Sequence, residues 1–346
     1  MVYEASDPYT CTPLVPETQS FMTSRLRLTS STLAAAASLL LLSVAPSATL
    51  AGPDPVPAAP PAAAEPNKFL QSSVAIYGTN YFNSDFDGLN TGFGVSRYSF
   101  YGEFKFKLSP IFRLKLFTYA DYSLYSFKNL PPPSPQFSNL LRGAAFERVD
   151  LTLAYTFTPG WAVVVGGRVT SGTSTNGDFA NSFTGGGILG IKKSIFSGAV
   201  DVTVGASYTS RLARPAQLLP YFDVDVNVLP EFVKIPVNLL FKWGGGIVSY
   251  RVTDNLSLMV EGRIDSRFYR LNRNSAVLAN GVWYESSGDI GGGFGYSPRG
   301  RNWTLSVLGG YSVFRNVQVY NTAGQKLFDN DVKPAPYINA NFHAAF

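Results

Sequence analysis

The sequence predicts an all-β fold, and three observations support this prediction. Apolar and polar residues alternate along most of the chain from Phe69 onward, which is the period of a β-strand with two different faces. Charged residues make up 15% and aromatic residues 14% of the sequence, while the mean hydropathy is only +0.05. The connections between the alternating segments are short and long in turn. Together these features are typical of a transmembrane antiparallel up-and-down β-barrel, here of about 12–14 strands with 14 favoured.

The N-terminal segment has the pattern of a cleaved signal peptide. Arg25 and Arg27 precede an apolar run over residues 33–44, and small residues lead to a cleavage position after Ala51. A membrane-anchoring helix is the alternative, but the apolar run is shorter than the ~20 residues that such a helix needs. We therefore predict that residues 1–51 are an N-terminal extension and signal peptide.

The segment that follows is predicted to be a disordered linker. Residues 52–67 are rich in proline and alanine, so they cannot bury a hydrophobic core. The barrel is predicted over residues 68–346. Met22 is an alternative start of the chain, because residues 1–21 show no pattern. The single cysteine, Cys11, precedes the predicted cleavage position, so we expect no disulfide and no thiol chemistry in the mature chain.

The alternation separates two faces on individual strands. In "RYSFYGEFKFKL", Tyr98, Phe100 and Phe104 share one face, and the opposite face is polar. The stretches "RLKLFTYADYSLYS" and "VDLTLAYTF" repeat the pattern. If the apolar face meets lipid, the charged residues of the polar face line the lumen. The predicted lumen charges are Arg97, Glu103, Lys105, Lys107, Arg113, Lys115, Asp121, Asp150, Arg168, Asp201, Arg251, Glu261 and Arg263.

The connections predict the orientation and the number of strands. Short ones such as "TPG" and "TDN" would be periplasmic turns, and long ones such as "SGTSTNGDFANSF" and "NTAGQKLFDNDVKP" would be external loops. Residues 217–252 break this regular order. A break at residues 244–246 would divide residues 236–252 into two short strands and give about 14 in total, whereas an infolded loop would leave about 12. An even number is expected, because both ends of the barrel then lie on the periplasmic side.

Two tryptophans directly follow short turns. Trp161 and Trp303 would then lie at the periplasmic membrane interface, where aromatic side chains form a girdle. The alternative is that each ring packs on a turn of a soluble core. The two matching placements favour the membrane interface.

The C-terminal stretch "YINANFHAAF" predicts a final strand with one apolar face. Ile338, Phe342 and Phe346 share that face. They resemble the C-terminal insertion signal that outer-membrane proteins as a group present to the barrel assembly machinery, although Ala344 stands where a larger residue is usual. We therefore expect the last strand to close onto the first, and we expect the lipid bilayer and the barrel assembly machinery as partners.

One stretch carries a resemblance to a known family. "SYRVTDNLSLMVEGRI", followed by "RFYRLNR", resembles a family of bacterial outer-membrane β-barrel proteins known only as a domain of unknown function. The resemblance covers roughly residues 70–346 and is specific mainly in the final third. It implies a multi-pass β-barrel in the outer membrane of a Gram-negative-type bacterium, and it implies no particular activity.

The sequence shows no catalytic constellation. His343 is the only histidine, and the "HAAF" that it begins lacks the His-x-Ser motif of an outer-membrane hydrolase. The glycine group "TGGGILG" is followed by no GK[ST], so it does not predict a phosphate loop. One histidine and no mature cysteine disfavour a metal site. We expect no enzyme activity and no cofactor. The net charge of +5 is spread along the chain, so we also expect no nucleic-acid partner.

The charged polar faces leave two interpretations of the lumen open. They could line an aqueous pore whose slight positive excess favours anions. They could instead form interior ion pairs that fill a narrow barrel and conduct nothing. A porin-like channel for small polar solutes with weak anion preference is the predicted function. A structural or loop-displaying, adhesin-like barrel is one alternative, and an outer-membrane acyl hydrolase that uses His343 is another.

Overall fold

The computed structural model describes most of the predicted barrel. The described residues are 69–128, 141–195, 200–226, 237–242, 245–273, 278–299 and 301–346. The predicted extension, signal peptide and linker lie outside these ranges, and so does the "NLPPPSPQF" stretch. The predictions made for those segments stay predictions.

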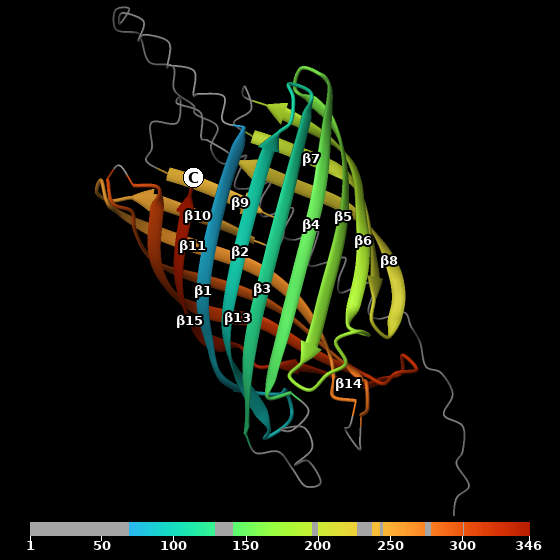
Figure 1. The fold of residues 1–346 in the computed structure, drawn as a ribbon. Coiled ribbons are helices and arrows are strands. Elements are labelled where there is room, and N and C mark those ends of the chain that lie inside the picture. The colour runs from blue at the N-terminus through green and yellow to red at the C-terminus, as the bar shows by residue number, and fades with distance from the viewer. Residues whose placement is uncertain are drawn as a thin grey trace, which may run out of the picture. The chain divides into compact units, whose positions relative to one another are not determined.

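The described chain forms one antiparallel sheet of long strands (Figure 1). The period-two runs of aromatic and β-branched residues become strands because such side chains fit a pleated, half-buried surface. Among the described residues, no helix is long and apolar enough to cross a membrane. The strands are β1 (Leu70–Asp85), β2 (Gly92–Lys107), β3 (Phe112–Lys128), β4 (Gly143–Thr158), β5 (Trp161–Ser174), β6 (Phe183–Ile195), β7 (Val200–Arg211), β8 (Arg214–Val226), β9 (Val237–Lys242), β10 (Gly245–Arg251), β11 (Leu256–Arg270), β12 (Val282–Tyr296), β13 (Trp303–Tyr320), β14 (Lys326–Val332) and β15 (Ala335–Ala345).

The last strand closes onto the first, as the sequence predicts. Strands β8 to β1 follow one another in the sheet, β15 lies beside β1, and β13 to β9 complete the order. Phe342 of β15 pairs with Ile76 of β1. Phe346 and Ser72 exchange two backbone hydrogen bonds, at 2.8 and 3.2 Å. The terminal residue is therefore part of the closure.

β14 and β15 together form one interrupted barrel strand. Both pair with β13. β15 pairs with the half of β13 that follows the short turn after β12, which we call the turn side of the barrel, and β14 pairs with the other half, on what we call the loop side. Only Lys333 and Pro334 separate them, and Pro334 has no N–H to donate to the ladder. The 15 strands of the sheet thus make a barrel of 14 strands, which is the favoured number. β9 and β10 are the two short strands expected in residues 236–252.

β14 corrects the prediction of a long external loop over residues 321–334. The chain reverses at Asn321, whose backbone N–H donates to the Gln325 carbonyl at 3.0 Å, and β13 and β14 then continue as a hairpin. Asn316 of β13 donates to Asp329 and Asp331 of β14, at 3.1 and 2.9 Å. Polar side chains that suggested a solvated loop instead pair across the hairpin.

The two faces of the sheet separate as predicted. Val149, Leu151 and Leu153 of β4 are between 39% and 49% exposed on the outer face, whereas Asp150 between them is 8% exposed on the inner face. Rows of exposed apolar residues of this kind continue around the other long strands. A continuous apolar surface is unfavourable in water and favourable in lipid. The fold is therefore a transmembrane antiparallel β-barrel.

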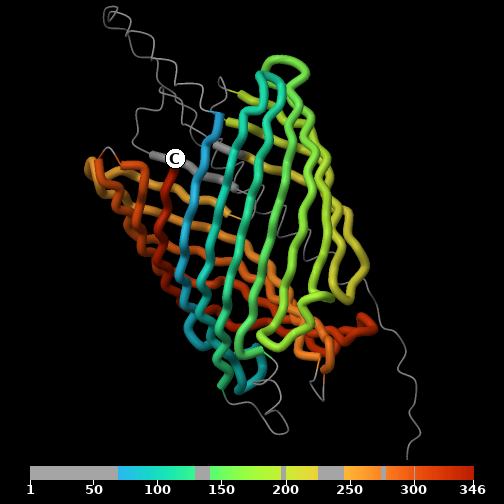
Figure 2. Tube along the Cα trace, viewed as in Figure 1, coloured from blue at the N-terminus to red at the C-terminus, as the bar shows by residue number. Residues whose placement is uncertain are grey.

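The loop-side ends of β11, β12 and β13 are buried on both faces. Trp283 and Val317 on one face are at most 2% exposed, and Val282 and Tyr320 on the other are at most 6% exposed. This part of the wall contacts β2 and β3 on one side, and β5 and the β7–β8 turn on the other. In Figure 2 the orange-to-red strands run across behind the steep blue-to-green strands. We call residues 267–271, 282–287 and 315–320 the loop-side seal.

Candidate functional site: the barrel interior

The predicted lumen charges lie on the polar inner face, at different depths. Arg97, Asp121, Glu261 and Arg263 belong to or border a network beside the loop-side seal. The others lie nearer the short turns, and they are Glu103, Lys105, Lys107, Arg113, Lys115, Asp150, Arg168, Asp201 and Arg251. Of these, Lys107, Arg113 and Arg251 are exposed at the turn-side mouth.

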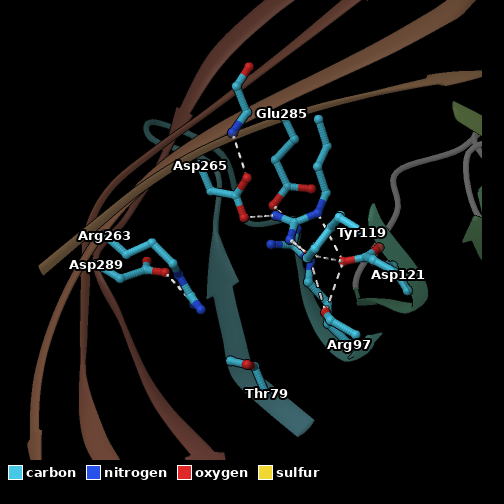
Figure 3. Close-up of polar contacts among 12 residues, drawn as sticks. Thr79, Arg97, Tyr119, Asp121, Arg263, Asp265, Glu285 and Asp289 are labelled. Carbon is cyan, nitrogen blue, oxygen red and sulfur yellow. Dashed lines mark hydrogen bonds and ion pairs between the residues drawn. The ribbon is translucent and has the colours of Figure 1, made fainter. Parts of the chain in front are cut away.

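Glu285 of β12 is the centre of the first ion-pair cluster (Figure 3). Its Oε1 accepts hydrogen bonds from Arg97 Nη2 of β2 at 2.7 Å and from Arg315 Nη2 of β13 at 2.9 Å. Its Oε2 accepts a hydrogen bond from the Tyr125 hydroxyl of β3 at 2.7 Å. The three charged side chains are at most 3% exposed. One carboxylate thus holds two buried guanidinium groups and joins two parts of the barrel wall.

Arg267 of β11 is the centre of the second cluster, and its partners Tyr119, Asp121 and Asp265 are labelled in Figure 3. Its Nε donates to Asp121 Oδ2 at 3.0 Å, and its Nη2 donates to the Tyr119 hydroxyl at 2.7 Å. Both partners lie on β3. Arg267 also pairs with Asp265 on its own strand. A second set of charged hydrogen bonds therefore crosses the lumen from β11 to β3.

Asp289 of β12 is the centre of the third cluster. Its Oδ2 accepts hydrogen bonds from the Tyr81 hydroxyl at 2.6 Å and from Arg263 Nη2 at 2.9 Å. Arg263 Nη1 also lies 3.6 Å from Glu261 Oε1. Buried charges that carry hydrogen-bonded partners of opposite sign cost far less than isolated ones. The three clusters therefore give each of these buried charges a partner of opposite sign.

An aromatic core packs around these clusters. The ring centroids of Phe93, Tyr125 and Trp283 lie 5.9–6.2 Å apart. The Arg315 guanidinium carbon lies 4.4 Å from the Phe93 centroid, which is cation–π geometry. Tyr269 is fully buried in the same cluster. Side chains of the wall thus fill the loop-side half of the lumen, and they correspond to the filled alternative of the sequence prediction.

Opposite walls also meet backbone to backbone at the loop side. Arg270 of β11 pairs with Thr173 of β5, although these strands lie far apart in the sheet order. A Cβ atom on Gly172 would lie 1.9 Å from the Phe268 carbonyl oxygen. Only glycine therefore permits this close approach.

The second face of the seal contacts the turn between β7 and β8. The Tyr284 hydroxyl donates to the Leu212 carbonyl at 2.6 Å. The guanidinium carbon of Arg214 lies 5.3 Å from the Tyr284 ring centroid and 5.2 Å from that of Tyr320. The seal is thus held on one face by ion pairs and on the other by these weaker contacts.

The turn-side half of the lumen is more exposed and more basic, and we call its inner face the turn-side vestibule. Glu103 lies 3.3 Å from Lys105 Nζ and 3.1 Å from Lys115 Nζ, and these two lysines are about a third exposed. Asp150 accepts two hydrogen bonds from Arg168, at 2.8 and 2.9 Å. The other charged groups here include Arg148, which pairs with Asp150, and Lys192, which pairs with Asp201.

Several charged groups of the clusters and of the vestibule were absent from the sequence prediction. Among them are Arg148, Asp265, Arg267, Glu285, Asp289 and Arg315. Glu285 and Asp289 do share one face of "VWYESSGDI" with Ser287, opposite Val282 and Tyr284, so the period-two rule could have found them. Arg315 could not be found this way, because a β-bulge changes the face on which it lies.

The predicted interface and insertion residues lie on the outer face. Trp161 is 39% exposed, and the Trp303 ring lies 5.9 Å from the Phe342 ring on the neighbouring strand. Ile338, Phe342 and Phe346 are between 40% and 67% exposed. These positions suit a girdle and a C-terminal apolar face, while recognition by an assembly machinery stays a prediction.

His343 lies on the polar face of β15. In the ladder it pairs with Ala75 of β1 and with Thr304 of β13. Within the described ranges, no group of three or more His, Cys, Asp or Glu side chains could hold a metal ion. That the chain is no enzyme and has no cofactor stays an expectation.

An even-stranded barrel with an apolar outer face and a polar interior defines an outer-membrane type of β-barrel protein. No family model and no curated protein matches the chain. The resemblance to a family of unknown function is therefore supported only in its coarser part, the outer-membrane type of β-barrel.

Solved structures similar to this chain include outer-membrane proteins. They include an outer-membrane channel from Pseudomonas putida F1, with TM-score 0.38 and 9% identity over 82% of this chain and 100% of that one. The TodX monoaromatic hydrocarbon channel has TM-score 0.33 and 8% identity over 80% and 89%. LpxR from Salmonella typhimurium has TM-score 0.30 and 11% identity over 79% and 99%. Similarity at this level defines no function for the chain.

Proposed function

We propose that the chain forms a gated outer-membrane channel for small anionic solutes, closed in the present conformation by the loop-side seal. The observation that carries this proposal is the Glu285 cluster. Apolar residues fill a permanent core at least as well as a buried ion pair does, since replacing such pairs by apolar residues is often neutral or stabilising. Ion pairs that join two walls of the barrel, as those of Glu285 do, differ from apolar contacts because a change in the charge of one partner breaks them.

The preference for anions follows from the turn-side vestibule. Lys105 and Lys115 are partly exposed to the lumen and outnumber their shared partner Glu103. A low-dielectric wall concentrates the field of such groups in a narrow lumen, which raises the local concentration of anions. The seal then determines whether those anions can pass.

The movement that opens the channel would be a displacement of the seal as a unit. Its two faces make separate contacts, ion pairs with β2 and β3 and weaker contacts with β5, β7 and β8. Packed elements with two sets of contacts switch between discrete arrangements rather than deform continuously. Loss of the ion pairs should therefore favour an arrangement in which the seal has left β2 and β3.

Single-channel recording in planar bilayers tests the proposal. We expect the native protein to open rarely, and Glu285→Gln to raise the open probability at least tenfold, because Arg97 and Arg315 then repel each other. Open channels should prefer anions, and Lys105→Glu with Lys115→Glu should reduce or reverse that preference. Asp254→Asn is the control, since its partner Arg299 and Asp254 are 85% and 74% exposed and lie at a turn.

A sealed structural barrel is the second candidate function. It is favoured by the aromatic core and by the backbone contact of Gly172 with Phe268, which close the loop side even without the ion pairs. The same recordings separate the two. A correctly folded Glu285→Gln protein that never conducts would contradict the channel and support the structural barrel.

A further inference from the structure

The loop-side rim carries a depression outside the seal. It lies where the connection between β5 and β6 meets the segment after β11, and Gly177 and Asn272 form a backbone bridge there. Its larger lobe has a volume of about 670 Å³ and is lined by residues 176–180, Asn272 and Arg273. A smaller lobe of about 260 Å³ shares Asn176 and Asn272 with it.

Two arginines give the depression a positive charge. Arg273 lines the larger lobe and Arg142 the smaller one, and both side chains are exposed. Neither has an ion-pair partner among the described residues. The one carboxylate in the lining, Asp178, accepts a hydrogen bond from Asn181 Nδ2 at 2.7 Å. The guanidinium groups are therefore available for a negatively charged ligand.

Ser174 marks the inner limit of the smaller lobe. It lines the smaller lobe and is only 3% exposed, yet its Oγ has no hydrogen-bond partner among the described residues. A buried hydroxyl without a partner is unfavourable, because its desolvation is not compensated. Because it is buried, the Ser174 Oγ lies behind the wall of the depression, out of reach of a ligand bound there.

We propose that this rim depression binds an anionic saccharide. The lining combines what such a ligand needs: guanidinium groups for its acid group, amide and hydroxyl groups for its hydroxyls, and the Phe179 ring for an apolar sugar face. The larger lobe has the size of a small-molecule site. No residue of the proposed gate belongs to the lining, so the inference does not depend on the proposed function.

The saccharide could be free in the medium or be the head group of an outer-leaflet glycolipid. Tyr122 and Leu124 line the smaller lobe and are each 43% exposed on the lipid-facing side of β3. With strands tilted by ~40°, residues this far from the turn after β2 lie near the upper limit of an apolar band of ~25 Å. A glycolipid head group would therefore reach the depression from the membrane.

Binding to the full chain in detergent micelles tests the proposal, with glucuronate and glucose 6-phosphate as probes and glucose as the uncharged comparison. We expect both anionic sugars to bind at least tenfold more tightly than glucose. Arg142→Gln with Arg273→Gln should weaken that binding tenfold or more. Arg299→Gln, an exposed arginine at a turn, is the matched control and should change it less than twofold.

A second arm distinguishes the two sources. The same proteins are bound to nanodiscs of phosphatidylcholine with or without lipopolysaccharide, and retained lipopolysaccharide is measured. Retention that depends on Arg142 and Arg273, without binding of the soluble sugars, supports the glycolipid source. Binding of the soluble sugars supports a free ligand. If neither probe binds, or if the double variant binds both as the native protein does while migrating as a folded barrel, the proposal is overturned.

Discussion

Replacing Glu285 by glutamine should destabilise the closed barrel strongly. The carboxylate accepts hydrogen bonds from Arg97, Arg315 and Tyr125 at 2.7–2.9 Å, and the arginine side chains are 3% and 1% exposed. The substitution keeps the shape of the side chain but leaves two guanidinium groups buried without a counter-charge. Removal of one partner from a buried ion pair costs about 3–5 kcal/mol. Because an amide oxygen still accepts a hydrogen bond, we expect the lower end, about 3 kcal/mol.

Urea unfolding of the refolded full chain measures this loss, with tryptophan fluorescence and heat-modifiable gel migration as readouts. Trp283 lies beside the cluster, so its emission reports on the seal itself. Asp254→Asn is the control. It breaks an ion pair at a solvated turn, and such exposed pairs contribute about 0–1 kcal/mol. The triple variant Arg97→Met, Glu285→Leu, Arg315→Met removes all three charges, and its stability should return toward that of the native protein.

The same measurement distinguishes a movable seal from a rigid one. If the seal can leave β2 and β3 while the barrel stays folded, the loss in unfolding free energy is limited to the free energy that holds the seal closed. Glu285→Gln would then show a smaller loss together with frequent channel openings. A loss below about 1 kcal/mol together with a silent bilayer would refute the reasoning on the cluster.

Two further changes test the contact between walls and the closure of the barrel. Gly172→Ala should lower the unfolding free energy by about 1–3 kcal/mol, because the new methyl group overlaps the Phe268 carbonyl. Gly167→Ala on the same strand is the control, since its methyl group would enter open space and should change the unfolding free energy by no more than about 0.5 kcal/mol. Equal urea midpoints for the two variants would contradict the contact. Deletion of Phe346 should reduce the amount of protein in the outer-membrane fraction several-fold, since it removes two backbone hydrogen bonds to Ser72 and the final apolar side chain. Phe346→Leu is the control and should leave most of the protein in that fraction. Normal levels after the deletion would count against an insertion signal.

The sequence predicts the faces of the strands well because that signal is local. Each strand of a barrel meets lipid on one side and the lumen on the other, so every second residue reports its own environment. The alternation around Asp150 therefore predicted an exposed Leu151 and a buried Asp150 correctly. The end of the chain was predictable for the same reason, since Ile338 and Phe342 follow the same period.

A single β-bulge shows where that rule fails. Before Val313, the even-numbered residues of β13 point inward, as buried Ser306 and Ser312 do. Val313 has no partner in the ladder with β12, and it and Phe314 are both exposed on the outer face. The bulge moves Arg315 to the inner face, where alternation from the start of the strand would not place it. One inserted residue thus decides whether the Glu285 cluster has a second arginine.

The seal was not predictable, because its partners are distant in the sequence. Arg97 and Glu285 are 188 residues apart, and Asp121 and Arg267 are 146 apart. Their meeting depends on how far one wall leans across the lumen, which no local pattern encodes. The burial of both faces is likewise hidden, since Val282 and Tyr284 resemble lipid-facing residues until the β7–β8 turn is placed beside them.

The positions of the rim depression and the seal imply that a bound ligand would favour the closed barrel. Leu271, the seal residue that follows the end of β11, directly precedes Asn272 and Arg273, which line the depression. The other side of the depression is the β5–β6 connection, whose Gly177 forms a backbone bridge with Asn272. A ligand that contacts both sides gains those contacts only while the walls are together, so it shifts the equilibrium toward the closed state. If both proposals hold, an anionic saccharide should lower the open probability of Glu285→Gln, and the open state should bind the saccharide more weakly by the same factor.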